Sequence, residues 1–143
     1  MVKANFLETD APAPTTLDID LTSPERFVNR ELSWLGFNWR VLEEAENPNV
    51  PLLERLRFLS ISATNLDEFY TVRVAGLREL SNEGNTTPGL DGRTPAEQLV
   101  VIDQDARALM ARHQVVFRQL DAELAKHDIH ILSRDALRDD DIA

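Results

Sequence analysis

The polar residues between Ser62 and Glu68 are those whose types could most directly bind a ligand. Two apolar-periodic segments meet there, so we predict that one helix ends near Ser62 and another begins near Leu66, with Asn65 at its N-terminus. An asparagine at that position can cap the helix, which contributes about 1 kcal/mol. Its amide also places a donor beside an acceptor, a pair that matches the edge of adenine. Local rules favour the cap and leave the ligand contact open.

The histidines are the other candidates for chemistry, as nucleophiles or metal ligands. His113, His127 and His130 are the three in the chain, which has no cysteine. His127 and His130 are close in sequence but straddle a helix end and lack a second carboxylate at ligand spacing. The phosphate-binding, nucleotide-binding, nucleophile-elbow and zinc-protease motifs are absent. We therefore expect all three histidines at the surface, and we predict no catalytic residue and no metal site in this chain.

The aromatic residues follow a helical spacing, which is typical of core packing rather than of a cofactor site. We expect five of them to hold the helices together: Trp34, Phe37, Phe58, Phe69 and Phe117.

Helix signals divide the first half of the chain. Residues 1–22 carry an Ala-Pro repeat, a pair of threonines and aspartates that alternate with apolar residues, so we predict a disordered tail. Ser23 followed by Pro24 reads as the N-cap and first turn that open the folded part, and Ser33 is a second possible cap. An apolar stripe from residue 29 predicts a helix that ends at Asn47-Pro48. Further helices are expected from about 51 and over residues 66–80; a strand over 70–74 is rejected because the helical period continues on both sides.

The second half contains one long helix. Residues 81–93 are rich in glycine and asparagine and read as a loop. Thr94, Pro95 and Glu97 form a capping box that begins a helix running to about His127, roughly 50 Å long. A short extended run at 129–132 follows, and the last residues read as the start of an unfinished element, as if the chain were cut from a longer one. These elements predict an all-α fold: an antiparallel bundle of three shorter helices and one long helix over residues 23–127, with residues 128–143 beginning the next domain.

Composition restricts the class of partner. The net charge is −10, from 25 acidic and 15 basic residues with no basic run, so nucleic acid and other polyanions are unfavourable partners. No apolar run approaches the ~20 residues that span a bilayer, and no secretory signal pattern is present, so we expect a cytoplasmic protein without a membrane span. A metal-binding four-helix bundle is not supported, because the Glu-x-x-His pairs that it needs are missing.

Two blocks of the sequence resemble a known family. NRELSWLGFNWRVLEEA followed by PLLERLRFLSISATNLDEFYTVRVAGL is similar to the N-terminal helical domain of the processive bacterial polyphosphate kinases, strongly over residues 27–77 and loosely to about 126. In that family the terminal phosphate of ATP passes reversibly to polyphosphate through a phosphorylated histidine, with magnesium. The resemblance implies that Asn65, which precedes Leu-Asp-Glu-Phe, contacts the adenine side of ATP. It also implies that the nucleophile and the magnesium site belong to later domains, so this chain alone is inactive.

The same resemblance suggests what the domain contacts. We expect its partners to be the remaining domains of the same enzyme and a second copy in a homo-oligomer. Arg55, Arg57 and Arg73 could reach such a neighbour, or could pair with Glu54, Asp67 or Glu68 on the helix surface, which we favour. The alternative function is a stand-alone acidic helical interaction module that binds no nucleotide.

Overall fold

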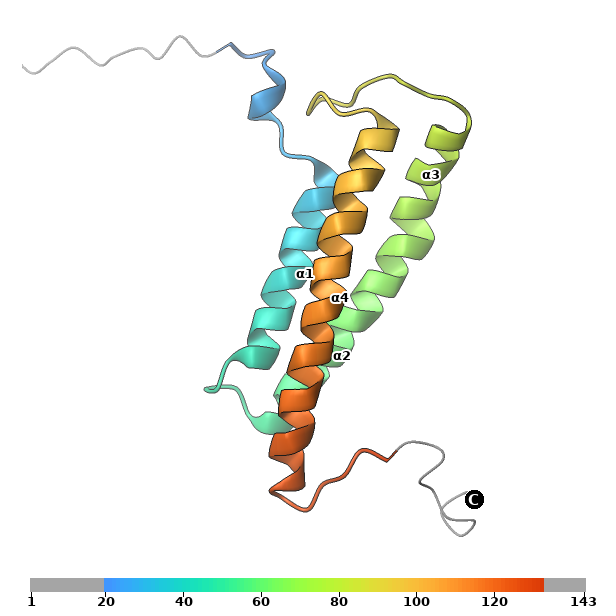
Figure 1. Ribbon diagram of the computed structural model, residues 1–143. Helices are drawn as coiled ribbons and strands as arrows, with labels where there is room; N and C mark the ends of the chain where they lie inside the picture. Colours follow the sequence, from blue (N-terminus) through green and yellow to red (C-terminus); the bar gives the residue numbers. More distant parts are fainter. Residues whose placement is uncertain (1–19, 133–143) are drawn as a thin grey trace, which may run out of the picture.

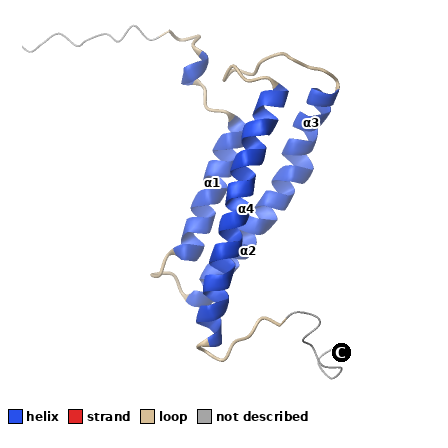
Figure 2. Ribbon diagram, in the orientation of Figure 1, coloured by secondary structure: helices blue, strands red, loops and turns tan. Residues whose placement is uncertain are grey.

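A computed structural model of the chain describes residues 20–132, and this part is all-helical, without strands (Figures 1 and 2). The elements in chain order are a 3-10 turn Pro24–Arg26, α1 Arg30–Glu46, α2 Leu52–Glu68, the π-helical segment η2 Phe69–Val74, α3 Ala75–Asn82 and α4 Pro95–Ala125. The predicted fold class is therefore confirmed. Residues 1–19 of the tail predicted over residues 1–22 lie outside the described residues. The unfinished element predicted near the end of the chain, from residue 133 onward, also lies outside them.

Asn29, rather than either predicted serine, caps α1. Its side-chain oxygen accepts hydrogen bonds from the amides of Glu31 and Leu32, both at 3.0 Å. Ser23 makes no capping hydrogen bond, and Ser33 lies inside α1. Local rules rank serine and asparagine alike as caps.

A contact far along the chain adds to the role of Asn29. Its Nδ2 donates to Asp91 and to Gln98, each at 2.9 Å, which ties the start of α1 to the loop before α4. Burial alone would raise the pKa of Asp91, but hydrogen bonds from Asn29 and Arg93 hold that pKa below its ordinary value. One side chain thus begins a helix and fixes a loop.

The predicted helix boundary at residues 62–66 is wrong. α2 continues through these positions to Glu68, and η2 and α3 follow without a break, so residues 52–82 form one continuous helical rod. Asn65 is consequently in the middle of a helix and caps nothing. Ser62 was expected near a helix end, but its carbonyl and hydroxyl groups bond to Asn38 of α1 and His113 of α4. No proline or glycine lies within α2 to interrupt the helix.

The π-helical segment η2 is where the rod changes its geometry. The Ala75 amide donates to the carbonyl of Tyr70, five residues earlier, in place of the four that an α-helix uses. The Thr71 hydroxyl donates to the carbonyls of Asp67 (3.0 Å) and Glu68 (3.1 Å) at the start of this segment. The structure confirms that the β-branched residues at 71, 72 and 74 do not form a strand. They lie in a helical turn that is wider than an α turn.

α4 begins with the predicted capping box, in which the Thr94 and Glu97 side chains each bond the other's backbone. Its 31 residues extend about 46 Å at 1.5 Å per residue, close to the predicted length. The helix ends at Ala125 and the chain reverses through Asp128, which has a positive φ of 58°. Residues 129–132 then form no strand.

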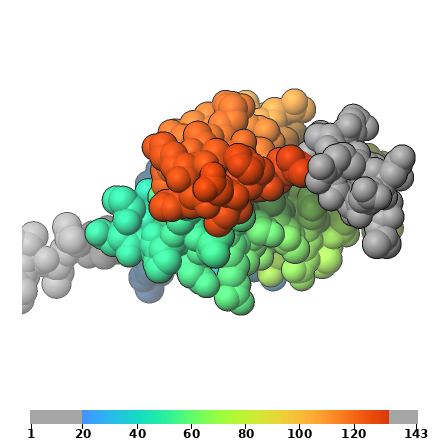
Figure 3. All heavy atoms as spheres, turned by 90° about the horizontal axis from the view of Figure 1, so that it is seen from below, coloured from blue at the N-terminus to red at the C-terminus, as the bar shows by residue number. Residues whose placement is uncertain are grey.

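The three rods pack side by side, with α1 and α4 running in one direction and α2–η2–α3 in the other (Figure 1). α1 contacts both α2 and α4, and α4 contacts both α2 and α3 of the second rod. Figure 3 views the end of the bundle where α4 finishes over the α1–α2 connection. The core consists of apolar side chains from every rod: Leu35, Leu42 and Ala45; Leu59, Leu66, Phe69 and Val74; Ile102, Ala106, Leu109, Val116, Leu120 and Leu124.

Two polar contacts fix the helices against one another. Trp39 Nε1 of α1 donates to Asp105 of α4 at 2.9 Å. Arg55 is largely covered, with 11% of its side chain exposed, and donates to the Ala45 carbonyl (2.9 Å) and to Glu123 (2.7 Å). The surface prediction for Arg55 is wrong, because its partners come from α1 and α4 rather than from its own helix.

Candidate functional site

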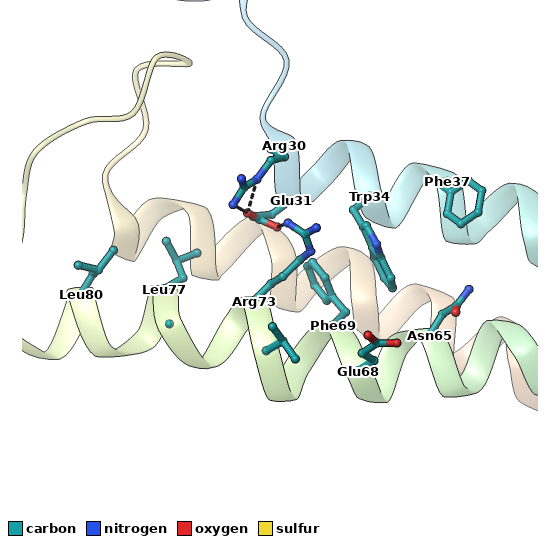
Figure 4. A pocket seen from close by; sticks show the side chains of 12 residues that line it. Arg30, Glu31, Trp34, Phe37, Asn65, Glu68, Phe69, Arg73, Leu77 and Leu80 are labelled. Atoms are coloured by element: carbon teal, nitrogen blue, oxygen red, sulfur yellow. Dashed lines mark hydrogen bonds and ion pairs between the residues drawn. The ribbon is translucent and has the colours of Figure 1, made fainter.

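A groove of about 680 Å³ lies between α1 and the rod formed by α2, η2 and α3 (Figure 4). We call it the α1–η2 groove. It combines aromatic, aliphatic, charged and amide side chains, contributed by these residues: Arg30, Glu31, Trp34, Phe37, Asn65, Glu68, Phe69, Val72, Arg73, Gly76, Leu77 and Leu80. Its volume lies in the range of small-molecule sites.

An aromatic stack forms the middle of the groove. Trp34 and Phe69 lie almost parallel, 8° apart, with ring centroids at 4.7 Å, and Tyr70 meets Phe69 edge-on at 6.0 Å. Phe69 is 1% exposed, so its prediction as a core residue is confirmed. Phe37 is 48% exposed at the rim of the groove, so its prediction as a core residue is wrong. The groove therefore has a rigid aromatic wall with an open edge.

The charged side chains that line the groove balance as a set, with Arg30 and Arg73 against Glu31 and Glu68. Glu31, 13% exposed at its side chain, accepts from Arg30 at 3.1 Å and from Arg73 at 3.3 Å (Figure 4). The two guanidinium groups are thus committed to one carboxylate, and Glu68 adds a further negative charge. This balance suits an uncharged aromatic ligand better than a triphosphate. Arg73 pairs with Glu31 rather than with its helix neighbours, whereas Arg57 lies near Glu54 at 3.7 Å as predicted.

Asn65 lies at one end of the groove, beside Trp34 and Phe37 (Figure 4). Its Nδ2 donates to Oδ1 of Asn38 on α1 at 3.3 Å. Among residues 20–132, no donor is hydrogen-bonded to its own Oδ1. The side chain that sequence reasoning singled out therefore reaches a groove, although from the middle of a helix rather than from a helix start.

A buried polar network continues from Asn65 into the bundle. Asn38 is 0% exposed; its Nδ2 donates to the Ser62 carbonyl at 2.9 Å. The Ser62 hydroxyl lies 2.8 Å from Nε2 of His113 on α4 and 3.4 Å from the Asn38 carbonyl. Burial holds the pKa of His113 below its ordinary value, so the neutral ring is favoured. Side chains from three helices meet in this network.

Sequence reasoning missed Asn38 and placed His113 at the surface, but His113 is 8% exposed. The spacing of apolar residues in the sequence indicates the burial of both residues. Asn38 falls between Leu35 and Leu42 in the buried stripe of α1, and His113 occupies the same stripe of α4 as Leu109 and Val116. Polar residues at core positions of a helical period indicate buried polar contacts.

A second groove, of about 600 Å³, lies between α2 and α4. We call it the α2–α4 groove. Its walls are mainly apolar and include Leu53, Leu56, Leu59 and Phe117, with His113 as a polar member. Phe117 was predicted in the core but is 38% exposed. This face offers mainly apolar contact area, and Arg57, Ser60 and Gln114 also line it.

Over residues 20–132, no three His, Asp or Glu side chains come together in a way that could hold a metal ion. Within the same residues, no helix has the length and apolar character needed to cross a bilayer. Of the described histidines, His113 bonds a serine and the other two are exposed.

The geometry defines a helical domain with one mixed polar-aromatic groove, and comparison with known proteins gives its family. Residues 27–132 match the family model of the polyphosphate kinase N-terminal domain. The chain is 50% identical to a polyphosphate kinase of Erythrobacter litoralis over 122 residues, 82% of this chain and 17% of that protein. It is 47% identical to that of Thermosynechococcus vestitus (92% and 18%) and 48% identical to that of Helicobacter pylori (74% and 16%).

The chain therefore belongs to the polyphosphate kinase family and represents its N-terminal domain. It spans less than one fifth of the length of these relatives, as the 16–18% coverage gives. No solved structure matches the chain significantly.

Proposed function

We propose that this chain forms the adenine-side wall of the ATP site in an enzyme that transfers the terminal phosphate of ATP reversibly to polyphosphate. The observation that carries the proposal is the position of Asn65, whose free carbonyl oxygen lies beside the Trp34–Phe69 stack in the α1–η2 groove. A nucleobase needs a flat apolar surface and a few edge hydrogen bonds, and this groove offers both. Asn65 is proposed as an ATP contact; no residue of this chain is proposed as catalytic.

The charges support a division of labour within the full-length enzyme. The arginines of the groove are occupied by Glu31, and the whole chain carries a net charge of −10. The triphosphate, the polyphosphate chain and magnesium are therefore assigned to later domains, together with the histidine that carries the phosphoryl group. The segment of residues 1–143 alone is proposed to be inactive, and the enzyme is proposed to be cytoplasmic.

The α2–α4 groove is proposed as the surface that the remaining domains of the same enzyme cover, directly or across a homo-oligomer. Most of the length of the relatives lies outside the matched segment. Leu53 (59% exposed) and Phe117 (38%) leave apolar area uncovered on this side of the bundle. Covering it would gain about 25 cal/mol for each Å² of apolar surface.

Steady-state kinetics of the full-length enzyme with Asn65→Ala test the nucleotide site. We expect the KM for ATP to rise roughly 5- to 20-fold with kcat little changed, because a base contact remote from the reacting phosphate is made equally in the ground and transition states. Asn82→Ala, an exposed asparagine at the end of α3, is the matched control and should leave the KM for ATP unchanged. An unchanged KM for ATP in Asn65→Ala, with thermal stability reduced, would instead assign Asn65 a purely structural role.

A further inference from the structure

We infer that Asn38 sets the orientation of the Asn65 amide and so makes the groove select a 6-amino purine over a 6-oxo purine. This inference rests on the proposed contact between Asn65 and the base. Asn38 has no place in the groove itself, being 0% exposed between α1 and α2, and it acts only through Asn65. It is therefore a positioning residue.

The first step is the orientation of Asn38, which its partner determines. One end of its amide faces the Ser62 carbonyl at 2.9 Å. A backbone carbonyl oxygen can only accept a hydrogen bond, so the group facing it must be Nδ2. Turning the Asn38 amide over would bring two acceptor oxygens together in a buried site, which is costly. The Oδ1 of Asn38 is consequently left to face Asn65.

The second step passes this orientation to Asn65. Oδ1 of Asn38 is an acceptor, so Asn65 must present its Nδ2 to it, at 3.3 Å. Turning the Asn65 amide over would again oppose two oxygens. The Asn65 Oδ1 and the second N–H are therefore held in fixed places for a ligand. The chain of contacts runs from a backbone atom of α2 through α1 and back to α2 (Figure 4 shows Asn65 at this end of the groove).

The consequence is a choice between purines. Adenine carries a donor at its 6-amino group beside an acceptor ring nitrogen, whereas hypoxanthine and guanine carry an acceptor oxygen at that position. An amide that is free to turn satisfies either pattern, because its two ends exchange places. A fixed amide matches one pattern and opposes like groups in the other, and buried polar groups that are left unpaired give strong discrimination. The groove is therefore selective only while Asn38 holds Asn65.

The test compares ATP with ITP in the full-length enzyme, because inosine triphosphate differs from ATP only in its 6-oxo purine. For Asn38→Ala we expect the ratio of kcat/KM for ATP to that for ITP to fall about tenfold, with the change in KM and not in kcat. Asn38→Asp should retain the wild-type ratio, because burial favours the neutral acid, whose O–H can donate to the Ser62 carbonyl while its other oxygen accepts from Nδ2 of Asn65. Asn38→Leu, which fills the space without an acceptor, replaces Asn38→Ala if thermal unfolding shows that the alanine variant is not folded.

Two further variants separate the possible outcomes. Trp39→Phe removes a different hydrogen bond between helices, that to Asp105, and should keep the ratio. Asn38→Ala in an Asn65→Ala background should change the ratio no further, because the residue through which Asn38 acts is gone. Equal ratios in Asn38→Ala and wild type, or an equal loss in Asn38→Asp and Asn38→Ala, would overturn the inference. If Asn65→Ala itself leaves both the KM for ATP and the ratio unchanged, the proposed function fails, and the inference with it.

Discussion

The two grooves of this domain are similar in volume, about 680 and 600 Å³, yet their walls differ in kind. The α1–η2 groove has an aromatic stack, paired charges and an oriented amide. The α2–α4 groove has a largely apolar surface formed by leucines, an alanine and Phe117, and its polar members Arg57, Ser60, His113 and Gln114 form no aromatic stack or oriented amide. Volume therefore does not identify a ligand site: groups that fix the orientation of a ligand do, whereas an apolar wall suits contact with another part of a protein.

The largest expected effect on stability comes from Phe69, which belongs both to the α1–η2 groove and to the core. Phe69→Ala should lower the free energy of unfolding of the 143-residue chain by about 3–5 kcal/mol, because Phe69 is buried and stacked on Trp34. Urea unfolding followed by circular dichroism measures this loss. Phe37→Ala, at the exposed rim of the same groove, should cost less than about 1 kcal/mol. Similar losses in the two variants would contradict a wall that is anchored in the core.

A smaller loss of stability is expected for a substitution in the α2–α4 groove. The size of this loss should depend on whether the other domains of the enzyme are present. In the 143-residue chain Phe117→Ser should cost about 1 kcal/mol or less, since the ring is 38% exposed. In the full-length enzyme the same change should cost about 1.5–3 kcal/mol, because the covered ring would be fully buried. Thermal unfolding of both forms tests this. Equal effects in the chain and in the enzyme would leave the groove without an interdomain role.

The smallest effect is a dependence of stability on pH, caused by His113. Burial lowers the folded-state pKa of His113 below its ordinary value of 6.5, so the unfolded chain binds more protons between the two pKa values. The contribution of the neutral ring to stability is complete above 6.5 and is lost as the pH falls through the folded-state pKa.

Unfolding of the 143-residue chain over a pH series measures this effect. His113→Gln should flatten the dependence, because glutamine does not titrate. His127→Gln, at an exposed position after α4, should preserve it. A pH dependence that survives unchanged in His113→Gln would assign it to other groups.

The sequence predicted the elements whose signals are local. The capping box at Thr94, the stop at Asn47-Pro48 and the long apolar stripe of α4 each depend on neighbours within one or two turns, and each is confirmed. The all-α class follows from these signals, and the family follows from the two blocks within residues 27–77.

What the sequence could not predict depends on partners distant in the chain. From the sequence alone, the polar residue Ser62 indicates a helix end, because its buried partners Asn38 and His113 are distant in the chain. Arg55 resembles a surface charge until Ala45 and Glu123 are placed beside it. The candidate site shows the same division, because Asn65 could be selected from sequence while the residue that orients it lies 27 positions away.

The π-helical segment at Phe69–Val74 has a consequence for how the rod tolerates a change in chain length. A π turn accommodates about one residue more than an α turn, and one residue corresponds to about 100° of helical rotation. A single-residue deletion within this segment would let the wide turn become a regular α turn, so the side chains of α3 would keep their direction relative to α1. The same deletion in a rod that was α-helical throughout would instead turn Leu77 and Leu80 away from the groove by about that angle. The wide turn would thus absorb the loss of one residue and keep both ends of the groove in place.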